Sequence, residues 1–139
     1  MSKSILDEPH AAVPAAVDGA NTPRRTMKLI SCIVRPERLE AVKEALDQLE
    51  LIKGMTVTDI RGFGRQKGQV EHYRGGEYRI RFVPKIKIEI AANAEDVERI
   101  MTSVKKAAWT GQVGDGKIFV LEMRDVLRIR TGEQGVIAL

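Results

Sequence analysis

The stretch TGQVGDGKIF, residues 110–119, decides the fold, because it joins a helical pattern to a strand pattern through a glycine-rich loop. Residues 95–108 before it carry apolar side chains at helical spacing, and residues 117–123 after it are rich in strand formers. The stretch also approaches the phosphate-binding pattern G-x-x-x-x-G-K-[ST]. However, Ile118 stands where that pattern needs a hydroxyl, and a P-loop follows a strand and opens a helix, the reverse of the order here.

This loop can nevertheless bind an anion. Gly114 and Gly116 flank Asp115, so backbone amides can turn into a concave nest, and Lys117 adds a positive charge. The alternative is a helix-to-strand turn that needs its glycines for geometry alone. Spacing by itself leaves both interpretations open, because isolated glycine loops are weak signals.

The composition indicates one soluble domain. The chain has 139 residues, 43% hydrophobic and 30% charged, with no apolar run long enough to span a membrane. The first 26 residues lack the apolar centre of a secretory signal. The single cysteine, Cys32, lies in the apolar run LISCIV and is predicted to be a buried small hydrophobe, which suits a cytoplasmic protein. One Cys and two His argue against a metal cluster.

The positive charge is concentrated in residues 61–87. Eight Lys or Arg side chains there accompany two Glu, a net charge of +6, which leaves −2 for the rest of a chain whose total is +4. Such a field attracts phosphates, carboxylates, nucleic acid or an acidic partner, and the plain alternative is a solvated basic loop.

Working outward, residues 27–139 are predicted to form one domain and residues 1–26 a disordered or regulatory extension, because the extension is rich in Ala, Pro and small polar residues without a sustained period. The domain shows the ferredoxin-like βαββαβ order of the α+β class, a sandwich with two helices over one face of an antiparallel sheet. The expected elements are a strand at 29–34, a helix after Pro36, a strand at 55–60, a glycine-rich polar loop at 62–77, a strand at 78–91, a helix at 95–108 and a strand at 117–123.

The strand at 78–91 is predicted to have two different faces. Its alternating isoleucines would face the core, and Lys85 would share the opposite face with Glu89. Pro84 predicts a bulge or an edge position. An exposed sheet face favours an oligomer. Residues 126–130 also alternate, which would point the two arginines of that segment the same way.

From Met27 onward the chain resembles the P-II nitrogen-regulatory signalling proteins. Three blocks carry the resemblance, supported by RIRTGE at 128–133: GMTVTDIRGFGRQKG (54–68), YRGGEY (73–78) and TGQVGDGKIFV (110–120). The resemblance implies a homotrimer of ferredoxin-like subunits that binds ATP or ADP in the clefts between subunits. On that basis the glycine loop is expected to hold phosphates.

Carried onto this chain, the resemblance implies a nucleotide site shared between neighbouring subunits. The glycine loop would cradle phosphates, Arg128 and Arg130 would reach them from the neighbouring subunit, and Thr56 and Ala91 would hold the adenosine end. The implied nucleotide-binding residues are Thr56, Arg65, Ala91, Gly114, Asp115, Gly116, Lys117, Arg128 and Arg130.

The resemblance also implies 2-oxoglutarate as an effector, bound through a Mg²⁺ ion that the ATP phosphates hold. Gln66 would be the magnesium ligand, and Lys85 would pair with a carboxylate; taken alone, Lys85 would be a solvated strand lysine. The implied 2-oxoglutarate residues are Gln66, Lys67, Gly68, Lys85 and Gly114. Because the ion bridges both ligands, binding should be cooperative with ATP and absent with ADP.

Residues 62–80 match the T-loop of the family, which docks onto targets such as an ammonium channel, nitrogen-metabolism enzymes or a uridylyltransferase. Arg74 matches the arginine that can plug a channel, and Tyr78 matches the tyrosine that is uridylylated in many members. The alternative for Tyr78 is an amphipathic residue at a strand start. Gly76 replaces the usual Ala or Ser, which excludes a serine-phosphorylation switch there.

Together these features imply a non-catalytic cytoplasmic sensor of nitrogen, carbon and energy status. One alternative is a slow ATPase, in which Glu89 positions a water, or an adenylate-ratio sensor without a 2-oxoglutarate response; no nucleophile–base pair is visible for catalysis. Another is a nucleic-acid-binding sheet, but only 4% of the residues are aromatic and none stands in the K/R-G-F/Y-G/A-F pattern. We therefore expect neither a nucleic-acid partner nor direct membrane insertion.

Overall fold

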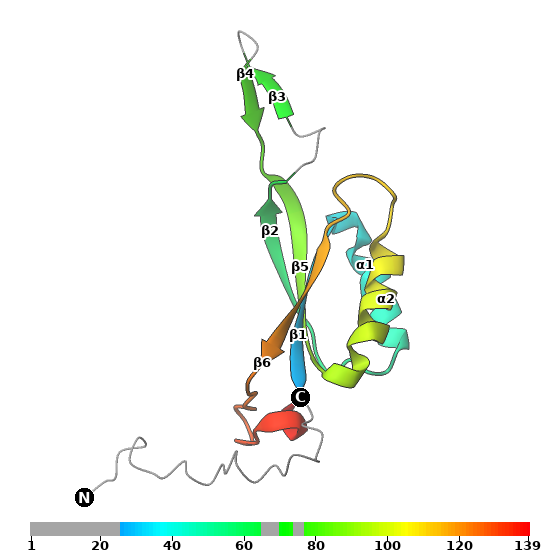
Figure 1. The fold of residues 1–139 in the computed structure, drawn as a ribbon, viewed down its shortest axis with the longest axis vertical. Coiled ribbons are helices and arrows are strands. Elements are labelled where there is room, and N and C mark those ends of the chain that lie inside the picture. The colour runs from blue at the N-terminus through cyan, green and yellow to red at the C-terminus, as the bar shows by residue number, and fades with distance from the viewer. Residues whose placement is uncertain (1–25, 65–69, 74–76) are drawn as a thin grey trace, which may run out of the picture.

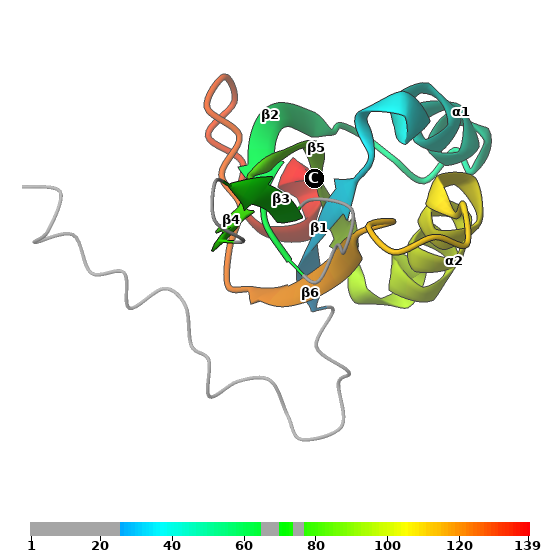
Figure 2. The ribbon, with the colours of Figure 1, turned by 90° about the horizontal axis from the view of Figure 1, so that it is seen from above.

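The computed structural model describes residues 26–64, 70–73 and 77–139. A four-stranded antiparallel sheet has the strand order β2-β5-β1-β6, and two helices cover one of its faces (Figures 1 and 2). The elements are β1 (Met27–Val34), η4 (Pro36–Arg38), α1 (Leu39–Gln48), β2 (Thr56–Gly62), β3 (Val70–Tyr73), β4 (Glu77–Ile80), β5 (Val83–Asn93), η6 (Ala94–Asp96), α2 (Val97–Ala108), β6 (Lys117–Met123) and η7 (Gly135–Ala138). The predicted α+β order is confirmed, with a second, two-stranded sheet of β3 and β4 inserted.

The core lies between the sheet and the helices. Alternate residues of β1 and β5 point toward α1 and α2, as the strand period of two requires. The fully buried side chains are Ile30, Val34, Val42, Leu46, Ile88, Ile90, Ile100, Val104 and Cys32. Burying one such aliphatic side chain contributes about 1.5–3 kcal/mol, so this layer stabilises the sheet against the helices. Cys32 is the buried small hydrophobe that the sequence predicted, and burial raises the pKa of its thiol to about 11.

Arg38 joins the start of one helix to the end of the other. Pro36 occupies the first turn before α1, where its missing N–H costs nothing. The Nε and Nη2 atoms of Arg38 donate to the carbonyl oxygen of Ala107 at 2.9 and 2.6 Å. That carbonyl belongs to the last turn of α2, whose orphan carbonyls need donors. Arg38 thereby ties the start of α1 to the last turn of α2.

The region between β2 and β5 differs from the prediction. The expected polar loop at 62–77 contains β3, and the single strand expected at 78–91 is divided at residues 81–82 into β4 and β5. The β3–β4 hairpin extends beyond the end of the main sheet (Figure 1). Pro84 does not break β5; it lies opposite Arg61 of β2 and beyond the last residue that β1 pairs, so one of its sides is an edge as predicted.

After β6 the chain forms no further strand within residues 124–139. The alternation at 126–130 does not correspond to a strand. Leu127 and Gln134 form an isolated bridge, and the chain turns back between them. Gly132 closes that turn with a positive φ of 74°. Within the described residues no helix is long and apolar enough to cross a membrane.

Candidate functional site

A cavity lies where the loop after α2 meets the base of the β3–β4 hairpin. Its volume is about 550 Å³. The lining residues come from β1, the end of β2 and the two residues after it, the start of β5, the loop and β6: Ile33, Gly62, Phe63, Gly64, Lys85, Val113, Gly114, Gly116, Lys117 and Phe119. Four residues that the sequence assigned to phosphate or carboxylate binding, namely Lys85, Gly114, Gly116 and Lys117, therefore share one cavity.

The backbone geometry requires glycine at position 116, whether or not a ligand binds there. Its φ is +103°, and a Cβ atom there would lie 1.7 Å from the carbonyl oxygen of Ile33. Gly114 has a φ of +105°. The loop backbone thus passes directly against β1 in a conformation that other residues rarely adopt. The sequence left open whether this loop is an anion nest or a turn that needs its glycines for geometry alone. Gly114 and Gly116 fit both interpretations.

Asp115 uses its carboxylate to hold the loop together. Its Oδ2 accepts from the backbone N–H groups of Thr110 and Gly111 at 2.7 and 2.9 Å, and its Oδ1 accepts from Arg35 Nε at 3.0 Å and from the Thr110 hydroxyl. Partial burial alone would raise the pKa of Asp115, but these donors more than offset it and hold the pKa well below its usual range.

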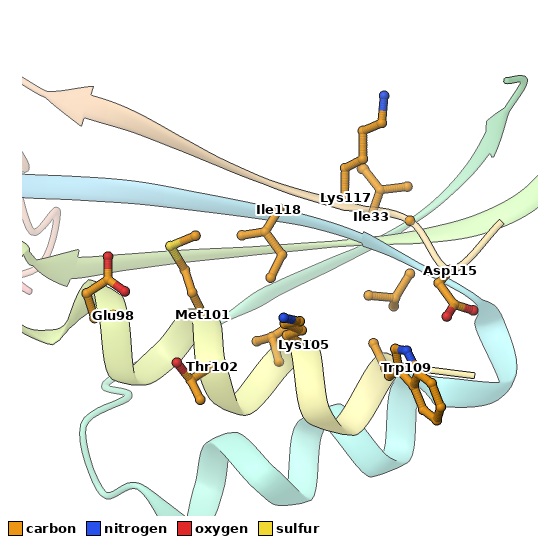
Figure 3. A pocket seen from close by; sticks show the side chains of 13 residues that line it. Ile33, Glu98, Met101, Thr102, Lys105, Trp109, Asp115, Lys117 and Ile118 are labelled. Carbon is orange, nitrogen blue, oxygen red and sulfur yellow. The ribbon is translucent and has the colours of Figure 1, made fainter. Parts of the chain in front are cut away.

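Figure 3 shows a neighbouring cavity of about 500 Å³ between α2 and the start of β6. Asp115 lies on this helix side, next to Trp109, whereas Lys117 and Ile33 point away from α2 on the other side of the sheet. Lys117 therefore reaches the cavity that contains Lys85, while the Asp115 carboxylate does not line it. The group of Asp115 that suits an anion is therefore its backbone N–H and not its carboxylate.

Lys85 is buried, with 7% of its surface exposed, and its ammonium donates to the carbonyl oxygen of Gly114. A solvated strand lysine is therefore the wrong interpretation of this residue. Desolvation, with the charge of Arg35 as the second cause, lowers the pKa of Lys85. Of its three N–H donors, one serves the loop, and no other acceptor within the described residues takes the remaining two, which suits an anion in the cavity.

Thr56 and Ala91 lie at the other end of the same sheet. They line a separate cavity of about 440 Å³ together with Glu89, the C-terminal Leu139 and six further residues: Leu29, Lys53, Gly54, Met55, Val126 and Ala138. Ala91 follows Lys85 by six positions in β5, which corresponds to about 20 Å along a strand. Glu89 lines this cavity, whereas Lys117 lines the one at the hairpin end.

Arg128 lies near this second cavity and already has partners. Its Nη1 donates to Glu133 Oε1 at 2.8 Å, and its Nη2 donates to the carbonyl oxygens of Ile137 and Leu139 at 3.1 and 3.4 Å. Arg130 is exposed. In a single chain those of the implied nucleotide residues that the structure describes therefore form two groups at opposite ends of the sheet.

Several predicted site residues lie outside the described residues, namely Arg65, Gln66, Lys67, Gly68 and Arg74. The backbone at Tyr78 belongs to β4. Across the parts of the chain that are described, no three His, Cys, Asp or Glu side chains gather as metal ligands. Sequence reasoning missed Arg35, whose only signal is its place directly after a buried strand.

Comparison with known proteins gives a consistent answer. The family model described as nitrogen regulatory protein P-II matches residues 27–133. The chain is 51% identical over 113 residues to nitrogen regulatory protein GlnK of Escherichia coli K12, which covers 81% of this chain and 100% of that protein. It is also 51% identical over 113 residues to nitrogen regulatory protein P-II of Bradyrhizobium diazoefficiens, with the same coverage.

Among solved structures, the fold resembles Arabidopsis thaliana PII bound to citrate. The TM-score is 0.68 at 39% identity, and the match covers 84% of this chain and 95% of that one. The matched proteins are regulatory signalling proteins rather than enzymes. The chain therefore belongs to the P-II family of nitrogen regulatory proteins.

Proposed function

We propose that the protein is a cytoplasmic, non-catalytic sensor that binds ATP or ADP, and 2-oxoglutarate with Mg²⁺, in clefts between the subunits of a homotrimer. It would report nitrogen, carbon and energy status to target proteins through the T-loop at residues 62–80. Targets of the expected classes are an ammonium channel, nitrogen-metabolism enzymes or a uridylyltransferase acting on Tyr78.

The observation that carries the proposal is the division of the nucleotide residues between two ends of one sheet. Gly114, Gly116 and Lys117 share the cavity at the hairpin end, and Thr56 and Ala91 share the cavity at the other end. Within one chain the two groups line separate cavities, and Thr56 of β2 and Lys117 of β6 lie on the two outer strands of the sheet. If the two groups act on one ligand, they must come from different subunits.

The face of the sheet away from the helices supports association. Phe119 and Leu121 of β6 pair with Ser31 and Leu29 of β1, whose neighbours Ile30 and Cys32 face the helices; the two β6 residues therefore point to the open face. They are 49% and 48% exposed, and Ile129 is 93% exposed. Apolar area of this kind commonly marks an interface.

The cavity at the hairpin end also supports a carboxylate ligand coupled to the T-loop. Buried Lys85 supplies a cation, and an anionic effector would satisfy it. Gly62, Phe63 and Gly64 line the same cavity and lead directly into the T-loop, so a ligand there would contact the base of the segment it is meant to move. Citrate, bound by the Arabidopsis relative, is likewise a carboxylate.

A subunit-mixing experiment tests the shared cleft. Lys117→Ala removes a cation from one half of the cleft, and Arg130→Ala removes one from the other half without disturbing the bonds of Arg128. Each homotrimer should bind ADP weakly. Trimers refolded from an equal mixture should regain tight binding in about a quarter of their clefts, those that combine two intact halves. Failure of the mixture to exceed the parents, measured by calorimetric stoichiometry, would contradict a cleft built from two chains.

A further inference from the structure

The loop at residues 110–116 is tied to itself by one carboxylate. Asp115 accepts from the backbone of Thr110 and Gly111 and from the Thr110 hydroxyl. These bonds join Thr110 and Gly111, at the start of the loop, to Asp115, near its end. A loop closed in this way keeps little backbone freedom, so less conformational entropy remains to be lost when a ligand binds.

Arg35 ties this closed loop to the rest of the molecule. It stands directly after β1, 80 residues from Asp115 in sequence. Its Nε donates to Asp115 Oδ1 at 3.0 Å, and its Nη2 donates to the carbonyl oxygen of Val113 at 2.8 Å. Both side chains are largely buried, with 16% and 24% of their surface exposed. One rigid guanidinium therefore fixes both a side chain and a backbone carbonyl of the same loop. A lysine ammonium on its flexible stem would reproduce this pair of bonds poorly.

The anchoring sets the direction of the loop peptides. In a trans peptide the carbonyl and the following N–H point in opposite directions. Because the Val113 carbonyl points to Arg35, the N–H of Gly114 points away from Arg35. The ammonium of Lys85 donates a hydrogen bond to the next carbonyl of the loop, that of Gly114. Two cations thus occupy two consecutive carbonyls before any ligand is present, which leaves the neighbouring amides as the free polar groups of the loop.

We propose that Arg35 is a positioning residue, which holds the 110–116 loop in its phosphate-receiving form through Asp115 and the Val113 carbonyl. This inference rests on the proposed nucleotide site. Arg35 does not line the cavity shared by Lys85 and Lys117, so it acts through the loop and not on the ligand. The benefit is preorganisation, since a loop ordered in advance spares the nucleotide the cost of ordering it.

The first test measures the order of the empty loop. In the full-length protein without nucleotide, Arg35→Met should speed amide hydrogen exchange at residues 110–117 by about tenfold or more, because a charge-assisted bond and a carbonyl bond are both lost. Arg38→Met is the matched control; it loses two bonds to Ala107 but none to the loop. It should leave exchange at 113–117 unchanged. Equal exchange in wild type and Arg35→Met would overturn the positioning role.

The second test measures ADP affinity by calorimetry. Arg35→Met should weaken ADP binding about tenfold to a hundredfold, and Arg35→Lys, which keeps a bond to Asp115 but not the second bond, should lie between. Arg38→Met should match the wild type even if its Tm falls. Wild-type affinity in Arg35→Met would overturn the inference alone. Absence of ADP binding by the wild type would instead overturn the proposed nucleotide site, and the exchange experiment would still report whether Arg35 holds the loop.

Discussion

Lys85 is the one buried charged side chain among the residues that the structure describes. Among those residues its ammonium has one hydrogen-bond partner, the Gly114 carbonyl, and burial accordingly lowers the pKa of Lys85. An uncompensated buried cation is costly, and an anionic ligand would offset that cost. The sequence placed Lys85 on the correct sheet face, but only the tertiary approach of the 110–116 loop, 29 residues away, buries it.

A pH dependence follows from this burial. A lysine binds a carboxylate only when protonated, so a lowered pKa means that the cation is lost at a lower pH than the ordinary 10.5. We expect 2-oxoglutarate affinity, measured in ATP and Mg²⁺, to fall as the pH rises toward and through that lowered pKa. Lys85→Arg, whose guanidinium stays charged, should flatten the profile. An affinity that stays constant up to the ordinary lysine range would argue against Lys85 as the carboxylate partner.

At the scale of elements, the alternating isoleucines of β5 and the apolar stripes of α1 and α2 were sufficient to predict the main sheet and its helical cover. The β3–β4 hairpin was missed because its two strands have four residues each and lie in a polar, glycine-rich segment. The anchoring of the 110–116 loop was missed for a different reason. Its bonds to Arg35 join residues about 80 positions apart, and no local pattern records such a contact.

The packing of this loop against β1 predicts different costs for two glycines. Gly116→Ala introduces a Cβ atom 1.7 Å from the Ile33 carbonyl, so the loop must move away from β1. Gly132→Ala also has a positive φ, of 74°, but no atom lies within 4 Å of the new Cβ. We expect Gly132→Ala to cost about 1–2 kcal/mol in urea unfolding through backbone strain alone. Gly116→Ala should cost more and also weaken ADP binding at least tenfold; equal effects of the two substitutions would contradict the close approach.

At the scale of the whole molecule, one chain presents two cavities, which we propose as halves of one site, and an exposed apolar sheet face. The cation-bearing loop and the T-loop base lie at one end, and Thr56, Ala91 and the C-terminal segment lie at the other. The sequence alone supplied the residues of both halves through the family blocks. It could not show their separation, because spacing along a chain does not reveal which end of a sheet a residue occupies. In the proposed cleft between subunits, the separation would tie ligand binding to assembly, since a partner chain would complete each site.

The most direct test of the sensor account is a calorimetric titration of 2-oxoglutarate into the full-length protein, once with ATP and Mg²⁺ and once with ADP. We predict binding in the ATP titration and none with ADP, because in the proposed site a magnesium ion held by ATP would bridge the effector to Gln66. Gln66→Ala should abolish the 2-oxoglutarate signal and leave ADP affinity nearly unchanged. Absence of 2-oxoglutarate binding while ATP still binds would contradict the account and leave the ATP-to-ADP ratio as the signal that this protein reads.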